Sequence, residues 1–207
     1  MMMMNNMEEF SHYQLTNPGI TLATLPTEVY PKVMGEIEEI QSSFETSEKY
    51  NYALAGNIKN QYYLNNSLPI ISPFLERMAN EYSKKWIQYS KEESYRLRSL
   101  WVNFQSKHEF NPIHSHDSVL SFVCWMKIPY SVQEEINTPH VKDSRAKAAS
   151  IFQFVYTDIL GHIRHEDFYV DNDWAGRIVM FPAALHHQVY PFYTSDDFRI
   201  SISGNLA

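Results

Sequence analysis

Histidine is the residue type in this chain that is best suited to chemistry. The chain has nine His and a single Cys, and imidazole is the commonest side-chain ligand for first-row transition metals. His114 and His116 are separated by one residue, just before the apolar run 119–128. Side chains two residues apart on a strand share a face, so both imidazoles can bind one metal ion. His186 and His187 are adjacent and point to opposite faces, so at most one of them adds a ligand.

A second polar pair lies near the C-terminus. Arg199 and Ser201 are two residues apart in a segment of strand composition, so they are expected to share a face. A guanidinium offers a planar fork of N–H donors to a carboxylate, and a serine adds an O–H donor. The pair therefore indicates a carboxylate site, unless Arg199 is an exposed side chain that pairs with Asp196 or Asp197.

Two helices are expected before residue 95. Apolar residues recur at helical spacing over Thr27–Phe44. A second helix is predicted from Ser72 as N-cap, with Pro73 at the first helical position, to about Tyr89. The segment 51–68 keeps neither the helical nor the strand period for long, so a short strand and a loop both stay open there.

From residue 96 onward, β-branched and aromatic residues predict seven strands. These are Arg96–Gln105, Val119–Ile128, Ile151–Ile159, Ile163–Val170, Arg177–Phe181, Gln188–Phe192 and Phe198–Ser203. Short strands without intervening helices favour an antiparallel sandwich or jelly roll. The segment 138–149 is expected to be an exposed loop or short helix, and His162 and His165 are expected to be exposed at a hairpin tip.

Composition narrows the class of protein. The chain has 207 residues, of which 44% are hydrophobic and 20% charged, as in a globular protein. We expect one structural domain, in which a helical elaboration over 1–95 packs on a β core over 96–207. The net charge of -7 argues against nonspecific nucleic-acid binding. A single Cys and the lack of a long apolar stretch predict a cytoplasmic protein that does not enter a membrane.

The order of the motifs is more specific than any one of them. They follow one another as His114-Ser115-His116, Gly176-Arg177-Ile178-Val179-Met180-Phe181-Pro182, His187, and Arg199-Ile200-Ser201. This order resembles that of the Fe(II)- and 2-oxoglutarate-dependent oxygenases, in particular their small prolyl-4-hydroxylase-like group that is common in phage genomes. The resemblance covers about residues 96–207 and, less diagnostically, residues 54–58.

The resemblance implies a mainly β protein with N-terminal helices: a double-stranded β-helix, or cupin-like jelly roll, with helices supporting one sheet. It also implies a dioxygenase that uses Fe(II), O₂ and 2-oxoglutarate to hydroxylate a substrate, with release of succinate and CO₂. The substrate is left open among a protein side chain, a nucleobase and a small metabolite. For a phage-encoded enzyme, the expected location is the host cytoplasm.

By the same resemblance, His114 is the proximal metal ligand and His187 the distal one. Most members of the family have Asp or Glu at the position of His116. Three sites are therefore open: one with three histidines, one in which Asp117 supplies the carboxylate, and one with two histidines and His116 outside the ligand set. We favour three histidines, because strand alternation directs Asp117 to the opposite face.

The resemblance further implies that Arg199 and Ser201 bind the C5 carboxylate of 2-oxoglutarate. Asn103 corresponds to a polar position near this cosubstrate, and Trp125 is expected to wall the pocket. Two alternatives come from other classes of protein. One is a cupin-type metal-binding protein with different chemistry, and the other is a non-catalytic jelly-roll module for binding or assembly.

Overall fold

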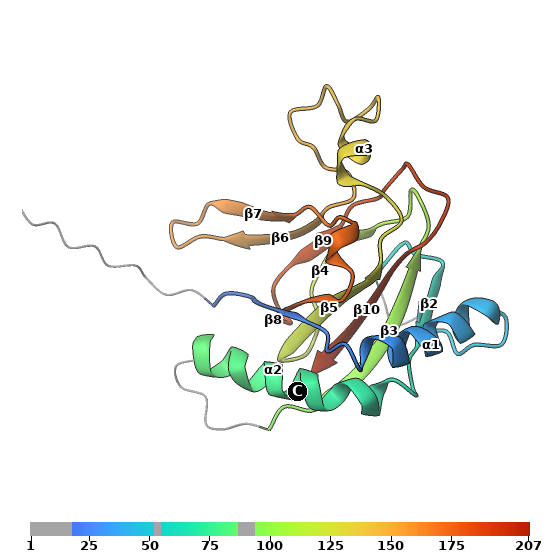
Figure 1. Ribbon diagram of the computed structural model, residues 1–207. Coiled ribbons are helices and arrows are strands. Elements are labelled where there is room, and N and C mark those ends of the chain that lie inside the picture. Colours follow the sequence, from blue (N-terminus) through green and yellow to red (C-terminus); the bar gives the residue numbers. More distant parts are fainter. Residues whose placement is uncertain (1–17, 52–54, 87–93) are drawn as a thin grey trace, which may run out of the picture.

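Two antiparallel sheets form the centre of the computed structural model, which describes residues 18–51, 55–86 and 94–207 (Figure 1). The six-stranded sheet has the order β1 (Thr21–Thr24), β8 (Arg177–Pro182), β5 (Leu120–Lys127), β10 (Arg199–Leu206), β3 (Leu97–Gln105), β2 (Asn60–Tyr63). The four-stranded sheet has the order β4 (Asn111–His114), β9 (His187–Val189), β6 (Phe152–Thr157), β7 (Ile163–Phe168). The strands therefore form the expected jelly roll.

Alternation along β10 gives the six-stranded sheet two different faces. Ile200, Ile202 and Leu206 are fully buried in the larger hydrophobic cluster. Side chains at the intervening positions point to the opposite face, where Ser201 and Ser203 line a cavity. One strand thus carries both the core and part of the candidate site.

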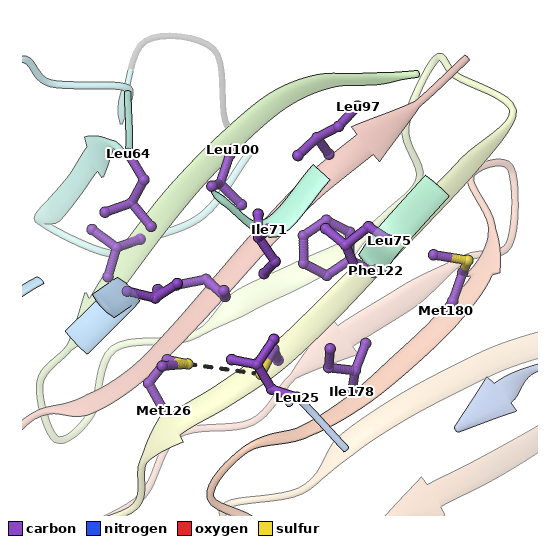
Figure 2. Close-up of a cluster of buried hydrophobic side chains, with 14 of the residues drawn as sticks. Leu25, Leu64, Ile71, Leu75, Leu97, Leu100, Phe122, Met126, Ile178 and Met180 are labelled. Atoms are coloured by element: carbon purple, nitrogen blue, oxygen red, sulfur yellow. Dashed lines mark hydrogen bonds between the residues drawn. The ribbon is translucent and has the colours of Figure 1, made fainter. Parts of the chain in front are cut away.

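Helices α1 (Tyr30–Ser42) and α2 (Leu68–Trp86) cover the apolar face of this sheet (Figure 1). Ile71 and Leu75 of α2 are completely buried and belong to the same cluster as Leu100 and Phe122 of the sheet (Figure 2). Burying each such side chain contributes about 1.5–3 kcal/mol to the free energy of folding, so the contact with α2 stabilises the apolar face of the sheet. The short helix α3 (Val132–Ile136) lies in the connection between β5 and β6, and a 3₁₀ turn, η2 (Asn172–Trp174), precedes β8.

The predicted start of the second helix is wrong by one turn. The helix begins at Leu68 and contains Pro73, and the Ser72 hydroxyl donates to the Leu68 carbonyl instead of capping an end. The Glu36 carboxylate accepts the backbone N–H of Ser67, which holds the chain at the start of the helix. The predicted end near Tyr89 lies outside the described residues. The first helix falls within its predicted range of residues 27–44.

All seven predicted strands are present with shifted ends, whereas the short strands β1 and β4 were not predicted. Strand β2 settles the open segment 51–68, since residues 60–63 pair with β3. Strands β1, β2 and β4 have four residues each, which is too short for an alternating pattern to stand out. Within the three described ranges, every helix is too short or too polar to span a lipid bilayer.

Candidate metal centre

Three histidines from two parts of the chain meet where β4 and β9 pair. His114 ends β4, His116 lies in the following loop, and His187 begins β9. The register of β4 and β9 pairs His114 directly with His187. One ring nitrogen from each residue lies within 4.8 Å of the other two, which is close enough for a shared metal ion.

The backbone fixes two of the three imidazoles. Nδ1 of His114 lies 2.7 Å from the Pro112 carbonyl oxygen, and Nδ1 of His187 lies 2.9 Å from the Leu185 carbonyl oxygen. A carbonyl only accepts, so each Nδ1 carries the proton and each Nε2 keeps a free lone pair. Metal-binding histidines are typically oriented in this way.

His116 is held by its backbone instead of its ring. Its N–H donates to the Ala183 carbonyl at 2.8 Å, which ties the loop after β4 to the turn after β8. The neighbouring Ser115 and Asp117 are exposed, and neither belongs to the cluster of candidate ligands in the described residues. Strand-like alternation therefore continues through the loop and directs Asp117 away from the site.

Burial keeps the three imidazoles neutral. Loss of hydration, followed by the proximity of His114, lowers the pKa of His116 to about 4. The same causes, in the same order, lower the pKa of His187 to about 3. Burial also lowers the pKa of His114. At neutral pH each ring is unprotonated, which is the form that binds a metal.

A cavity lies beside the histidines, between the two sheets. Its polar wall includes three side chains that form a chain of hydrogen bonds. The Gln61 amide donates to Asn103 Oδ1 at 2.8 Å, and the Asn103 amide donates to Ser201 Oγ at 3.3 Å. The structure therefore brings Asn103 and Ser201 into the same cavity as the three histidines.

Sequence reasoning missed three polar residues of this wall: Gln61, Asn111 and Ser203. Ser203 continues the alternation of Arg199 and Ser201, so the sequence contained a signal for it. Gln61 reaches the cavity because β2 pairs with β3, and no local pattern reports that pairing.

The remaining wall is apolar and uncharged. Phe152 and Phe181 lie against the His187 ring, with centroid separations of 5.7 Å and 4.9 Å. Among the described residues that line the cavity, none is Asp, Glu, Lys or Arg. Any net charge inside the cavity must therefore come from bound ligands.

Arg199 lies at the start of β10 on the same face as Ser201, but the described cavity wall does not include it. Its side chain is buried, with 3% exposed, and its five N–H groups make five hydrogen bonds. Two go to Gln105 Oε1, one to the Tyr130 hydroxyl, and one each to the carbonyls of Ser150 and Tyr190. All of these acceptors are neutral.

The structure places Trp125 behind the cavity rather than on its wall. Trp125 is buried with 2% exposed, and its ring packs edge-on against Phe152 and Trp174. Phe152 in turn contacts His187. Trp125 thus supports the residue that forms the wall.

The donor set fits a divalent transition metal. Three neutral imidazoles are suitable ligands for iron, and they leave coordination positions open for other ligands. Two of the three rings have the second nitrogen fixed by a carbonyl, as a stable centre requires. The adjacent polar wall offers amide and hydroxyl groups to a ligand that shares the metal.

Comparisons with known proteins agree with this arrangement. Residues 99–205 match the family described as "Putative 2OG-Fe(II) oxygenase". No functionally curated protein sequence matches the chain.

Solved structures share the fold at low sequence identity. A prolyl-4-hydroxylase from Pseudomonas putida is 13% identical, with 90% of this chain and 91% of that chain covered and a TM-score of 0.57. A 2OG-Fe(II) oxygenase family protein from Burkholderia pseudomallei is 15% identical, with coverages of 91% and 85% and a TM-score of 0.52. HygX from Streptomyces hygroscopicus, solved with nickel, 2-oxoglutarate and hygromycin B, is 12% identical, with coverages of 90% and 82% and a TM-score of 0.50.

The family match spans more than half of the 207 residues and contains all three clustered histidines. The similar structures have the same double-stranded β-helix fold, as expected for this family. The chain belongs to the 2OG-Fe(II) oxygenase family, whose cofactors are Fe(II) and 2-oxoglutarate.

Proposed function

We propose that this protein hydroxylates its substrate while converting 2-oxoglutarate and O₂ to succinate and CO₂, with His114, His116 and His187 as the iron ligands. The observation that carries the proposal is the convergence of three imidazoles, one buried and two partly buried, beside a cavity. Two of them have their Nδ1 protons held by backbone carbonyls. Asp117 is exposed, so the carboxylate common in this family is replaced by His116.

Charge balance supports 2-oxoglutarate as the ligand beside the metal. Three neutral imidazoles leave the two positive charges of Fe(II) uncompensated, and the described cavity wall adds no ionic group. Separating charge from water in such a cavity is costly unless a counter-charge is present. A dianion such as 2-oxoglutarate supplies that counter-charge.

Arg199 is proposed to bind the distal carboxylate of 2-oxoglutarate together with Ser201. A buried guanidinium whose hydrogen bonds all go to neutral oxygens lacks the partner that stabilises it most. A carboxylate forms charge-assisted hydrogen bonds that are about twice as strong as neutral ones, so it can displace one of these oxygens. The Tyr130 hydroxyl belongs to a side chain that can rotate, so it is the oxygen that we expect the carboxylate to displace from Arg199.

Asn103 is proposed to orient the cosubstrate from the same wall as Ser201, its partner in the β3–β10 register. Its side-chain oxygen accepts from Gln61, and this fixes its amide N–H groups toward Ser201 and Ser203. Gln61 is 1% exposed and Asn103 5% exposed, so both are held rigidly. Trp125 has an indirect part, because it supports the Phe152 wall.

The iron and cosubstrate, when bound, supply the oxidising chemistry that uses O₂, releases CO₂ and succinate, and adds one oxygen atom to a C–H bond of the substrate. The residues of the chain hold the metal and the cosubstrate and shield them from water. The three imidazoles keep coordination positions open. Phe152 and Phe181 exclude water from the His187 side, which strengthens the polar contacts inside the cavity.

Succinate formation tests the proposal. The purified protein, given Fe(II), 2-oxoglutarate, ascorbate and O₂, is expected to form succinate slowly, as measured by NMR. Three classes of candidate substrate are then screened for stimulation of succinate formation: proline-containing peptides, nucleobases, and small hydroxylated metabolites. His187→Ala is expected to abolish succinate formation, whereas His186→Ala, its exposed neighbour, is the matched control. Formation of succinate by His187→Ala at the wild-type rate would contradict the proposal.

A second candidate function is that of a cupin-type metal-binding protein with other chemistry. It is favoured by the N–H donors of Arg199, which are all bonded within the protein and leave none free for a carboxylate. Such a protein needs the histidines but no 2-oxoglutarate. A protein that binds Fe(II), depends on the three histidines and forms no succinate would have this second function. A raised KM for 2-oxoglutarate in Arg199→Lys would support the oxygenase.

A further inference from the structure

The β6–β7 hairpin projects from the body of the protein and ends in a free sheet edge (Figure 1). Strand β7 pairs with β6 on one side and has no second neighbour within the described part of the chain. Residues 163–167 of this strand are all exposed. An exposed edge strand is a template for pairing with another strand.

The register identifies which backbone groups of β7 face outward. The N–H of Val155 donates to the His186 carbonyl, so this residue of β6 turns its backbone groups toward β9. His165 is opposite Val155 in the β6–β7 ladder. Residues opposite each other in an antiparallel pair both face inward or both face outward. His165 therefore presents its N–H and C=O to the free edge, as do Ile163 and Asp167.

The order of charges along β7 is self-complementary in one register. When two copies pair antiparallel about a two-fold axis, the residue on the axis lies opposite its own copy. With His165 on the axis, Arg164 of each copy lies opposite Glu166 of the other. Registers centred on Arg164 or on Glu166 place like charges on the axis. Opposite charges across a pair stabilise a sheet, and like charges destabilise it.

The Arg164–Glu166 pairs would occupy favourable positions in this ladder. They are non-hydrogen-bonded pairs, in which the Cα atoms approach to about 4.5 Å and the side chains are closest. Arg164 uses its Nε on Asp158 at 2.7 Å. Glu166 has no ion-pair partner among the described residues, so its carboxylate is free to bind an arginine.

The tip of the same hairpin is apolar. Ile159, Leu160 and Ile163 are 67%, 75% and 70% exposed. In the His165-centred register, the tip of one hairpin lies beside the base of the other, where Tyr169 is 44% exposed. Ile163 of each copy lies opposite Asp167 of the other in this register and meets Tyr169 only diagonally.

We propose that two copies of this chain associate through β7, joining their four-stranded sheets into one continuous sheet. The occupant of the edge is a second copy because the order of charges along the strand is complementary to itself. The proposal is independent of the enzymatic function, since none of its residues lines the cavity.

Sedimentation equilibrium of the full chain across a range of concentrations tests the proposal by charge reversal. The wild type is expected to be a dimer. Arg164→Glu and Glu166→Arg are each expected to weaken association about tenfold or more, because each creates two like-charge pairs. The double variant with both changes restores opposite charges and is expected to dimerise like the wild type. Arg145→Glu, an exposed change outside the hairpin, is the matched control.

Two results would overturn the proposal. One is a wild-type protein that is monomeric at every concentration, which would mean that the charges on β7 only protect a free edge. The other is a dimer that persists unchanged in Arg164→Glu. Circular dichroism of each variant shows that it is folded.

Disulfide formation tests the register. His165→Cys places two thiols on the axis and is expected to cross-link on mild oxidation, more readily than Arg164→Cys or Glu166→Cys. The native Cys124 is buried and does not compete. Preferential cross-linking at position 164 or 166 would contradict the register.

Discussion

The two ends of the proposed site, the histidine cluster and Arg199, differ in how their polar atoms are bonded in the protein. At the histidine end, Nε2 of His114 and of His187 carries a free lone pair, because each Nδ1 is bonded to a backbone carbonyl. At the Arg199 end, every N–H is already taken by oxygens of Gln105, Tyr130 and two backbone carbonyls. The histidines therefore have nitrogen atoms free to bind a ligand, whereas all the N–H donors of Arg199 are bonded within the protein.

The difference follows from charge. A neutral imidazole can be buried with one nitrogen unbonded at small cost, and the lowered pKa of each clustered histidine keeps it neutral. A guanidinium is always charged, so burial with unbonded N–H groups would cost several kcal/mol. Binding at the first end therefore adds bonds, whereas binding at the second end exchanges them.

The largest expected effect is at the histidine end. His187→Ala removes a ligand while leaving the other two, and Fe(II) affinity is expected to fall at least about 100-fold. Equilibrium dialysis under anaerobic conditions measures the affinity, with His186→Ala as the control. Equal affinities in the two variants would remove His187 from the metal centre.

Loss of stability is expected to be largest at the Arg199 end. Arg199→Ala leaves Oε1 of the buried Gln105 and the Tyr190 carbonyl without this donor and removes one of the two donors of the Ser150 carbonyl, so the free energy of unfolding is expected to fall by about 3 kcal/mol. Urea unfolding of the metal-free protein measures this change. His116→Ala is expected to cost less than half as much. Equal losses in the two variants would remove the difference between the ends.

The pH dependence of stability sharpens the comparison at the histidine end. The folded protein holds the pKa of His116 at about 4 and that of His187 at about 3, whereas an unfolded histidine titrates near 6.5. Between these values the unfolded chain binds more protons than the folded chain. The free energy of unfolding of the metal-free protein is therefore expected to fall as pH decreases from about 6.5 to 4.

Urea titrations at several pH values measure this slope. It is expected to approach ~1.4 kcal/mol per pH unit for each histidine that stays neutral. His116→Ala reduces the slope if its neutral state is the cause. An unchanged slope in that variant would assign the dependence to other groups.

The smallest expected effect concerns the exchange of bonds at Arg199. Tyr130→Phe removes the hydroxyl that the cosubstrate is proposed to displace. Stability is expected to fall by about 1 kcal/mol. The KM for 2-oxoglutarate is expected to fall about twofold to fivefold, because one N–H of Arg199 no longer needs to be freed. A raised KM would show that the hydroxyl stays and helps to hold the cosubstrate.

Much of the fold could be predicted because its signals are local. The seven predicted strand segments are rich in β-branched and aromatic residues, and the helices have regular apolar spacing. The start of α2 was misassigned because Ser72-Pro73 has the composition of a helix start, whereas the helix begins one turn earlier, after Ser67, whose N–H the Glu36 carboxylate accepts. The short strands β1, β2 and β4 depend on their partner strands rather than on their own sequences.

In the candidate site too, features set by local sequence could be predicted, and contacts between distant segments could not. Alternation predicted that His114 and His116 share a face and that only one of His186 and His187 points inward. The structure agrees, since His187 is 4% exposed and His186 is exposed. The bonds of Arg199 could not be predicted, because its partners come from loops and strands far away in the sequence. Gln61 was missed for the same reason.

The central claim is that three histidines hold an iron ion that 2-oxoglutarate also binds. Its most direct test is an anaerobic titration of the metal-free protein with Fe(II) and then 2-oxoglutarate, followed by visible absorption. The wild type is expected to develop the metal-to-ligand charge-transfer band of a chelated complex. His187→Ala is expected to show no band, and Arg199→Ala is expected to need more 2-oxoglutarate. Absence of the band in the wild type, with Fe(II) not retained, would contradict the claim.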